Sequence, residues 1–289
     1  MILRLPGREV SFPRRPLVMG IVNINDDSFS GDGDLDPERV LAQVCAQSEA
    51  GADMIDLGAE SARTNRAAIP SQEEVRRLRP VLEAWPEALE RLKPRDDVQV
   101  WPPVLSVNTW RLEVIEAVLP YGVELINDMS ALPDDRNARL CAEAGAALLI
   151  MHSKGAPKEA HRGEQWEDIM ASLERFFREK SDLAMAAGMS AEHLVLDPGI
   201  DFAKEKEDNL TIYRELGKLV ALGRPILLPV SRKGVIGDVL GIEDPKERDA
   251  GTMASVALGI EQGAHIFRVH NVDAVWSCVK VVWEVVSVD

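Results

Sequence analysis

Short aliphatic runs recur along the chain, and a polar residue stands at or just after the end of each one. Most of the runs do not alternate, which is typical of strands that are buried on both faces of a parallel sheet. We expect strands at 17–24, 54–57, 104–107, 123–126, 147–151, 194–196, 225–230 and 266–269. The polar residues at their ends are Asn23, Glu60, Asn108, Asn127, His152, Asp197, Ser231-Arg232-Lys233 and Arg268-Val269-His270.

Amphipathic segments separate these runs. Asp36 is followed by Pro37 at the start of one such segment, and Ser71 with Glu74 has the spacing of a capping box. Helical periodicity predicts helices over 36–47, from Ser71 onward, and over 166–187, 207–222, 249–262 and 272–286. Between a helix and the next strand, where a helix commonly ends in glycine, stand Gly51, Gly122, Gly145, Gly188, Gly223 and Gly263.

Eight strand–helix units in one chain predict a (β/α)₈ barrel, an α/β fold of the TIM-barrel type, as a single domain over 1–289. Residues 1–13 alternate around Pro6-Gly7 and predict a short N-terminal hairpin that closes one end of the barrel. The charged stretch 87–97 is interpreted as an insertion or extended loop. An open doubly wound sheet is the alternative, but the turn after the first strand lacks the glycine-rich pattern of that fold.

Composition narrows the class of protein. The chain has 289 residues, of which 46% are hydrophobic, and a net charge of −15, which argues against binding to nucleic acid or to an anionic membrane. Three separated cysteines favour neither a disulfide framework nor a structural zinc site. Neither a signal peptide nor an apolar run of about 20 residues is apparent, so we expect a cytoplasmic protein.

Strand ends of a barrel meet at one mouth, so their polar residues are candidates for a site. Arg268 and His270 are two positions apart and can point the same way, and with Arg63 and Lys233 they predict an anion pocket. Taken one at a time, each of these residues is more typical of an ion pair with one of the many carboxylates; it is the set, all at strand ends, that favours a site.

Three further strand ends carry other chemistry. Asn23 can hold a hard cation through its amide oxygen or can cap a turn. Asp197 can accept hydrogen bonds from an amidine-like N–H edge, although Asp-Pro-Gly is also a common turn sequence. His152 either lines the pocket or bonds to a loop.

The chain resembles dihydropteroate synthase, a family of pterin-binding barrels, over 16–286. The resemblance is carried by these motifs, in this order: Met19-Gly20-Ile21-Val22-Asn23, Asp27-Ser28-Phe29-Ser30, Gly51-Ala52-Asp53, Glu60-Ser61-Ala62-Arg63, Ser106-Val107-Asn108-Thr109, Ile126-Asn127-Asp128, Met151-His152, Asp197-Pro198-Gly199-Ile200, Ser231-Arg232-Lys233 and Arg268-Val269-His270. It implies a (β/α)₈ fold and condensation of 6-hydroxymethyl-7,8-dihydropterin diphosphate with p-aminobenzoate, giving 7,8-dihydropteroate and pyrophosphate in folate synthesis.

The resemblance also implies site residues. The catalytic ones would be Asn108, Lys233 and Arg63. The pterin would be held by Asn108, Asn127, Met151, Asp197 and Lys233. The diphosphate would be held by Asn23, Arg63, Arg268 and His270, with Mg²⁺ on Asn23. The p-aminobenzoate site, which sulfonamides also occupy in the family, would be bordered by Ser231, Arg232 and Phe202.

Several positions depart from the family pattern. Asn108 stands where the family usually has Asp, which keeps an acceptor oxygen but loses a negative charge. The other departures are Asp26, Ala62, Thr64, Asp201, Ala203 and Pro229. Two hypotheses therefore stand: an active synthase, or a non-catalytic relative that binds a pterin or a similar ligand. A folate-binding corrinoid methyltransferase barrel is disfavoured by the motifs for p-aminobenzoate and diphosphate.

The resemblance also implies a homodimer with an interface near the last strands. Segment 272–286 is apolar enough for that role, and it is equally suited to packing on its own barrel.

Overall fold

The computed structural model of the chain describes residues 1–26, 33–61, 66–159 and 165–287. Eight parallel strands pair in the order β8-β7-β6-β5-β4-β3-β10-β9, and the parallel bridge between Leu196 and Ile226 brings the two edges of the sheet together. The strands are β3 (Leu17–Asn23), β4 (Met54–Gly58), β5 (Val104–Asn108), β6 (Leu125–Asp128), β7 (Ala147–Met151), β8 (Leu194–Asp197), β9 (Leu227–Leu228) and β10 (Ile266–Val269).

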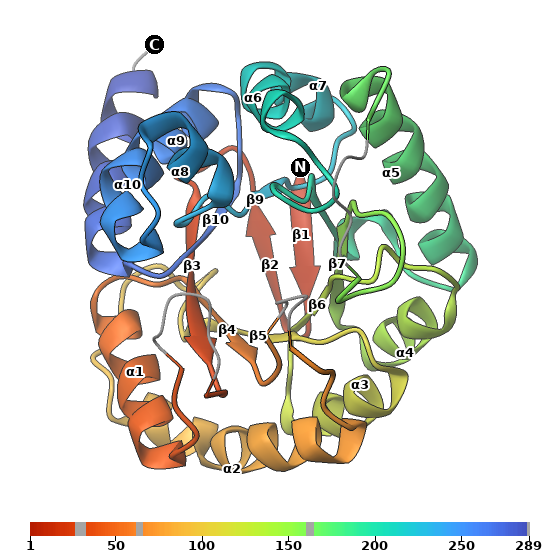
Figure 1. Ribbon diagram of the computed structural model, residues 1–289. Helices are drawn as coiled ribbons and strands as arrows, with labels where there is room; N and C mark the ends of the chain where they lie inside the picture. Colours follow the sequence, from red (N-terminus) through yellow and green to blue (C-terminus); the bar gives the residue numbers. More distant parts are fainter. Residues whose placement is uncertain (27–32, 62–65, 160–164, 288–289) are drawn as a thin grey trace.

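Helices surround these strands on the outside (Figure 1), so the predicted (β/α)₈ barrel is confirmed. The α-helices are α1 (Pro37–Glu49), α2 (Ser71–Glu90), α3 (Leu112–Val118), α4 (Arg136–Ala144), α5 (Ile169–Ala186), α6 (Lys206–Glu215), α7 (Gly217–Val220), α8 (Gly234–Leu240), α9 (Asp249–Glu261) and α10 (Val272–Val286). Short 3₁₀ turns lie at η1 (Leu119–Tyr121), η2 (Ala191–His193) and η3 (Pro245–Arg248). In the described ranges, no helix has both the length and the apolar character that crossing a bilayer needs.

The predicted N-terminal hairpin is also confirmed. Strands β1 (Ile2–Leu5) and β2 (Arg8–Ser11) pair antiparallel and lie across the middle of the ring in Figure 1. Leu3 and Val10 are fully buried, and with Leu5 and Phe12 they share one apolar cluster with the inward-facing side chains of the barrel strands. The hairpin therefore seals the N-terminal end of the barrel and leaves the C-terminal end for a site.

Some of the predicted helix ends are confirmed, and one is wrong. Asp36 caps α1 by accepting a hydrogen bond from the backbone N–H of Glu38. All six glycines expected between a helix and the next strand have positive φ. The capping box at Ser71 is wrong: Pro70 is the N-cap residue of α2, and Glu74 is fully buried because it pairs with Arg111.

Predicted boundaries also shift: the strands expected at 123–126 and 225–230 are β6 and the two-residue β9, and three helices differ. Helix α2 continues to Glu90, so the first part of the supposed loop 87–97 is helical. Helix α5 begins at Ile169, three residues later than expected, because Asp168 caps it through the N–H of Ala171. The expected helix 207–222 is two helices, which meet at Leu216 and Gly217.

Candidate active site

Strand register places three asparagines in one row across the barrel mouth. Asn23 is the register partner of Gly58, Gly58 that of Asn108, and Asn108 that of Asn127. Gly58 leaves a gap between its neighbours, because a Cβ there would lie 3.7 Å from the Asn108 Cβ and 3.8 Å from the Asn23 Oδ1. The row thus offers neutral amide groups, side by side, to whatever occupies the mouth.

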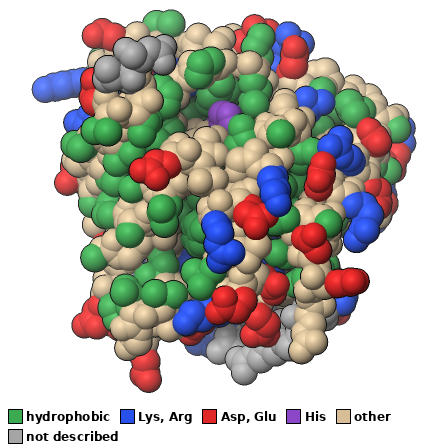
Figure 2. Space-filling model, turned by 90° about the horizontal axis from the view of Figure 1, so that it is seen from above, with side chains coloured by type: hydrophobic (Ala, Val, Ile, Leu, Met, Phe, Trp, Pro, Cys, Tyr) green, Lys and Arg blue, Asp and Glu red, His purple; other side chains and the backbone are tan. Residues whose placement is uncertain are grey.

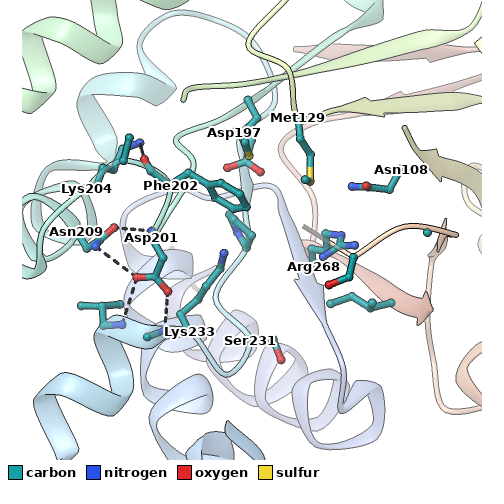
Figure 3. Close-up of a pocket in the computed structure, with 18 of the residues that line it drawn as sticks. Asn108, Met129, Asp197, Asp201, Phe202, Lys204, Asn209, Ser231, Lys233 and Arg268 are labelled. Carbon is teal, nitrogen blue, oxygen red and sulfur yellow. Dashed lines mark hydrogen bonds between the residues drawn. The ribbon is translucent and has the colours of Figure 1, made fainter. Parts of the chain in front are cut away.

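Charged groups lie across the mouth from this row. Figure 3 shows Asp197, at the end of β8, and Lys233, at the start of α8, on one side and Asn108 on the other. The Lys233 ammonium lies 4.9 Å from the centre of the Phe202 ring and donates to the backbone oxygen of Ile200 at 2.8 Å. Arg268, from β10, lies between the two sides in the same view.

These side chains line a cavity of about 670 Å³, within the usual range for a site that binds small molecules. The cavity wall includes most of the residues that the sequence singled out: Asn23, Asn108, Asn127, Met151, Asp197, Phe202, Ser231, Lys233, Arg268 and His270. Ten residues from seven of the eight strands or the turns after them therefore converge as predicted. Arg63, with Ala62 and Thr64, lies outside the described residues.

Two predicted residues are not part of the cavity wall. Arg232, at φ +58°, turns its guanidinium to the Asp249 carboxylate, with 2.8 Å between Nε and Oδ1. His152 takes the second of its two predicted roles: it is buried, and its Nδ1 lies 2.9 Å from the Nζ of Lys204. A place for Arg232 beside p-aminobenzoate therefore remains a prediction.

Asp56 is the main residue that the sequence reasoning missed. It is fully buried within β4 and accepts hydrogen bonds from Ser106 Oγ at 2.6 Å, Asn127 Nδ2 at 3.0 Å and Arg268 Nε at 2.7 Å. It therefore fixes two residues of the cavity wall from below. A lone carboxylate inside an apolar run was the available signal, because a buried charge is rare unless it is paired.

Ser231 and His270, which both line the cavity, are hydrogen-bonded to each other. The Ser231 hydroxyl lies 2.8 Å from the His270 Nδ1 and accepts from the His270 backbone N–H at 3.1 Å. This pair connects the turn after β9 to the end of β10. Sequence spacing placed both residues at the mouth but gave no sign that they bond to each other.

Burial shifts the protonation of the charged groups. It raises the pKa of Asp197 to about 6, even though a hydrogen bond from the Gly199 N–H and three nearby cations act in the other direction. It lowers the pKa of Lys233 and lowers that of Lys204 to about 7. These groups lie in a medium that strengthens their interaction with a ligand, because the dielectric constant is low there.

Lys204 was another residue that the sequence reasoning missed. Its Nζ donates to the backbone oxygens of His152 at 3.2 Å and Phe202 at 2.9 Å. The amine therefore ties the turn after β8 to the end of β7. In the sequence it stands in the highly charged segment 204–208, which is typical of a solvated surface.

Oxygen donors for a hard cation are present at the mouth. Asn23 lines the cavity, and so does Asn25, whose side-chain amide is buried without a hydrogen-bond partner in the described residues. Mg²⁺ commonly takes few protein oxygens and completes its shell with water and substrate phosphates. The described residues contain no group of three or more His, Cys, Asp or Glu side chains placed to hold a metal. The donors present fit Mg²⁺ shared with a phosphate ligand.

A barrel mouth with this arrangement suits a planar polar ring joined to an anion. The buried carboxylate of Asp197 can accept from ring N–H groups, Phe202 offers an aromatic face, and Arg268 and Lys233 offer positive charge. A family model for a "Pterin binding enzyme" matches residues 19–270. Fold, site and match together define the class as the pterin-binding barrel enzymes.

Similar proteins narrow the class. The dihydropteroate synthase of Synechocystis sp. is 35% identical over 93% of this chain and 89% of that protein. A structure of the Yersinia pestis dihydropteroate synthase with a sulfonamide drug is 32% identical, with a TM-score of 0.88 over 99% of each chain. The Xanthomonas albilineans enzyme with 4-aminobenzoic acid is 33% identical, with a TM-score of 0.85 over the full length of both chains. The chain belongs to the dihydropteroate synthase family.

Proposed function

We propose that this chain joins 6-hydroxymethyl-7,8-dihydropterin diphosphate to p-aminobenzoate, giving 7,8-dihydropteroate and pyrophosphate. The observation that carries the proposal is the buried Asp197 with Lys233 near it, which face a row of asparagines across a cavity of about 670 Å³. The family and its named relatives support the same reaction.

The residues act chiefly by placement and charge. Asp197 accepts hydrogen bonds from the N–H edge of the pterin, and Asn127 holds the same ring. The bond between the pterin methylene and the diphosphate oxygen breaks, and the amine nitrogen of p-aminobenzoate forms the new bond to that methylene and loses a proton. Arg268 and His270 contact the diphosphate. Preorganised groups of this kind supply much of an enzyme's acceleration without a strong base.

Mg²⁺ belongs to the proposal as well. Asn23 and the unpartnered amide of Asn25 are the groups that would hold it. When bound beside the diphosphate, the ion would neutralise negative charge on the leaving group.

The p-aminobenzoate site is proposed at the rim formed by Ser231 and Phe202, both of which line the cavity. The relative from Yersinia pestis was solved with a sulfonamide drug, and the one from Xanthomonas albilineans with 4-aminobenzoic acid. We therefore expect a sulfonamide to compete with p-aminobenzoate in this chain.

A homodimer is proposed on the apolar side of the molecule. Figure 2 shows hydrophobic side chains gathered on the side where α8, α9 and α10 lie in Figure 1. The exposed residues on these helices are Val239, Leu240, Leu258, Val281, Val285 and Val286. Contiguous apolar surface of this kind is typical of an interface.

A cytoplasmic location is proposed on the three separated cysteines, all of them free thiols.

A non-catalytic relative that binds a pterin is the second candidate. Two observations favour it: Asn108 lacks the charge that the family pattern has there, and the Nε of Arg268 is already paired with Asp56. The first weakens stabilisation of positive charge that develops at the pterin methylene, and the second leaves less of Arg268 for a departing diphosphate; neither removes the pterin pocket.

Product formation from both substrates with Mg²⁺ distinguishes the two candidates. Dihydropteroate is measured by chromatography for the wild type and for Asn108→Asp. We expect product from the wild type and turnover up to about 10²-fold higher in Asn108→Asp, because one preorganised charge is worth that order. Pterin binding without product in either protein would establish the non-catalytic candidate instead.

A further inference from the structure

Two turns of the cavity wall are fastened to each other by a single carboxylate. The turn after β8 carries Asp201, and the turn after β9 leads through Lys233 into α8. The Asp201 Oδ2 accepts from the backbone N–H of Gly234 at 2.5 Å, and its Oδ1 accepts from that of Val235 at 3.2 Å. Figure 3 shows these bonds. Both acceptors thus hold the first turn of α8.

The fastening is reciprocal. Lys233 directly precedes the two residues that Asp201 holds, and its ammonium returns to the backbone oxygen of Ile200, directly before Asp201, at 2.8 Å. Asn209 of α6 holds the same turn, because its Oδ1 accepts from the Asp201 N–H at 2.9 Å. The backbone and the ammonium of Lys233 are therefore both fixed by one turn.

The local backbone is strained in a way that this contact explains. Asp201 has φ +68°, a left-handed conformation that is unfavourable for residues with a side chain and that Asp tolerates better than most. Helix α8 has no side-chain cap from its own N-cap residue, Lys233. Glycine at 234 leaves room for the carboxylate, because a Cβ there would lie 3.3 Å from the Asp201 Oδ2. Charge-assisted bonds to a helix N-terminus offset the strain.

We propose that Asp201 is a positioning residue, which acts through Lys233 by setting where the Lys233 ammonium stands in the pterin pocket. The inference rests on the proposed function, since it concerns placement for the same pterin. It assigns a role to a residue that departs from the family pattern.

Charge gives Asp201 a second effect on Lys233. Four charged groups face the ammonium: Asp201, Asp197, Arg268 and Lys204. Burial lowers the pKa of Lys233, and Asp201 is the largest of the influences that raise it again, ahead of Asp197. The alkaline limit of pterin binding should therefore depend on the charge at 201.

The test measures binding of 6-hydroxymethylpterin by calorimetry, together with the melting temperature, for Asp201→Gly and Asp201→Asn. Asp201→Gly removes both bonds and the strain, and we expect pterin affinity to fall about 10-fold while KM for p-aminobenzoate changes less than twofold. Asp201→Asn keeps an acceptor and tolerates the backbone conformation. We expect its affinity at pH 7 to stay within about threefold of wild type, with the alkaline limit of binding moved to lower pH.

The matched control is Asp168, which caps α5 through the Ala171 N–H and is not part of the cavity wall. Asp168→Gly should lower the melting temperature and leave pterin affinity unchanged. The role of Asp201 is overturned if Asp201→Gly binds pterin as tightly as the wild type does. If the glycine variant fails to fold, the role is overturned when Asp201→Asn leaves the alkaline limit of pterin binding unchanged. A wild type that binds no pterin would overturn the proposed function itself, and the role of Asp201 with it.

Discussion

Two buried carboxylates, one at each end of the barrel, have opposite surroundings. At the sealed end, Asp53 accepts from two nitrogens of Arg15 at 3.0 and 3.2 Å and from the backbone N–H of Val18 at 3.0 Å. At the open end, the bond that the structure gives Asp197 comes from the Gly199 N–H at 2.6 Å. The cations near Asp197 are turned to other acceptors, as Lys233 is to the backbone oxygen of Ile200.

The difference separates charges that hold the fold from charges that await a ligand. A carboxylate paired with a guanidinium inside the protein has its acceptors satisfied. Asp197 is buried with a raised pKa, which means that the folded protein accommodates its charge at a cost. Groups that are shifted in this way collect at functional sites, where a substrate supplies the missing partner.

The largest expected effect is on pterin binding in Asp197→Asn. Asn keeps an oxygen for the Gly199 N–H but presents N–H donors and no charge to the N–H edge of the pterin. We expect affinity to fall by about 10²-fold, because a site built for one hydrogen-bonding pattern rejects a mismatch strongly. Calorimetry with 6-hydroxymethylpterin measures the change.

The free energy of unfolding of Asp197→Asn should not fall as its pterin affinity does. The raised pKa of Asp197 means that its stabilising contribution is present below pH 3.8 and lost as the pH rises through about 6. At pH 7.5 the Asp197→Asn variant should therefore be at least as stable as the wild type.

The matched change Asp53→Asn should lower the free energy of unfolding by about 3–5 kcal/mol and leave pterin affinity unchanged. If Asp197→Asn and Asp53→Asn lowered pterin affinity equally, the proposed difference between the two ends of the barrel would be wrong.

A change in the sealing hairpin should affect stability alone. Leu3 is fully buried in the cluster that the hairpin shares with the barrel interior. Leu3→Ala should lower the free energy of unfolding by about 2–5 kcal/mol, since it removes buried methyl groups and leaves a cavity. Urea denaturation measures the loss. A large drop in pterin affinity in this variant, measured where the protein is still folded, would show that the two ends are coupled.

The smallest expected effect is that of pH on the wild type. Asp197 must be ionised to accept from two ring N–H groups, and its pKa is about 6 in the free protein. Pterin affinity should be nearly constant from pH 8 to 7 and should fall about 10-fold per pH unit below 6. Asp197→Asn is the control, because its affinity should lose this acidic limb.

The sequence located the site better than it located the contacts that build it. Strand ends are marked by polar residues after apolar runs, so Asn108, Asp197 and Lys233 could all be assigned to one mouth. Asp56 could not, because its partners Ser106 and Arg268 lie 50 and 212 residues away in the chain. Pairings of this kind depend on strand register and on side-chain direction, which local patterns do not encode.

Local signals also misled where tertiary contacts were stronger. Glu74 has the spacing of a capping box with Ser71, yet it turns inward to pair with Arg111, since α2 packs beside α3. Lys204 resembled a surface lysine, although it is buried and bonds the backbones of two turns. In both cases the buried group is held by a partner that is distant in sequence, Arg111 for Glu74 and His152 for Lys204.

The most direct test is to count the protons released when 6-hydroxymethylpterin binds to the wild type at pH 6. Binding heats are measured in buffers of different ionisation enthalpy, with Asp197→Asn beside the wild type. If the mouth holds a carboxylate that awaits the pterin, about half a proton should leave Asp197 at this pH, and this release should be absent in the variant. Equal proton release by the two proteins would contradict the assignment of Asp197 as the group that receives the pterin.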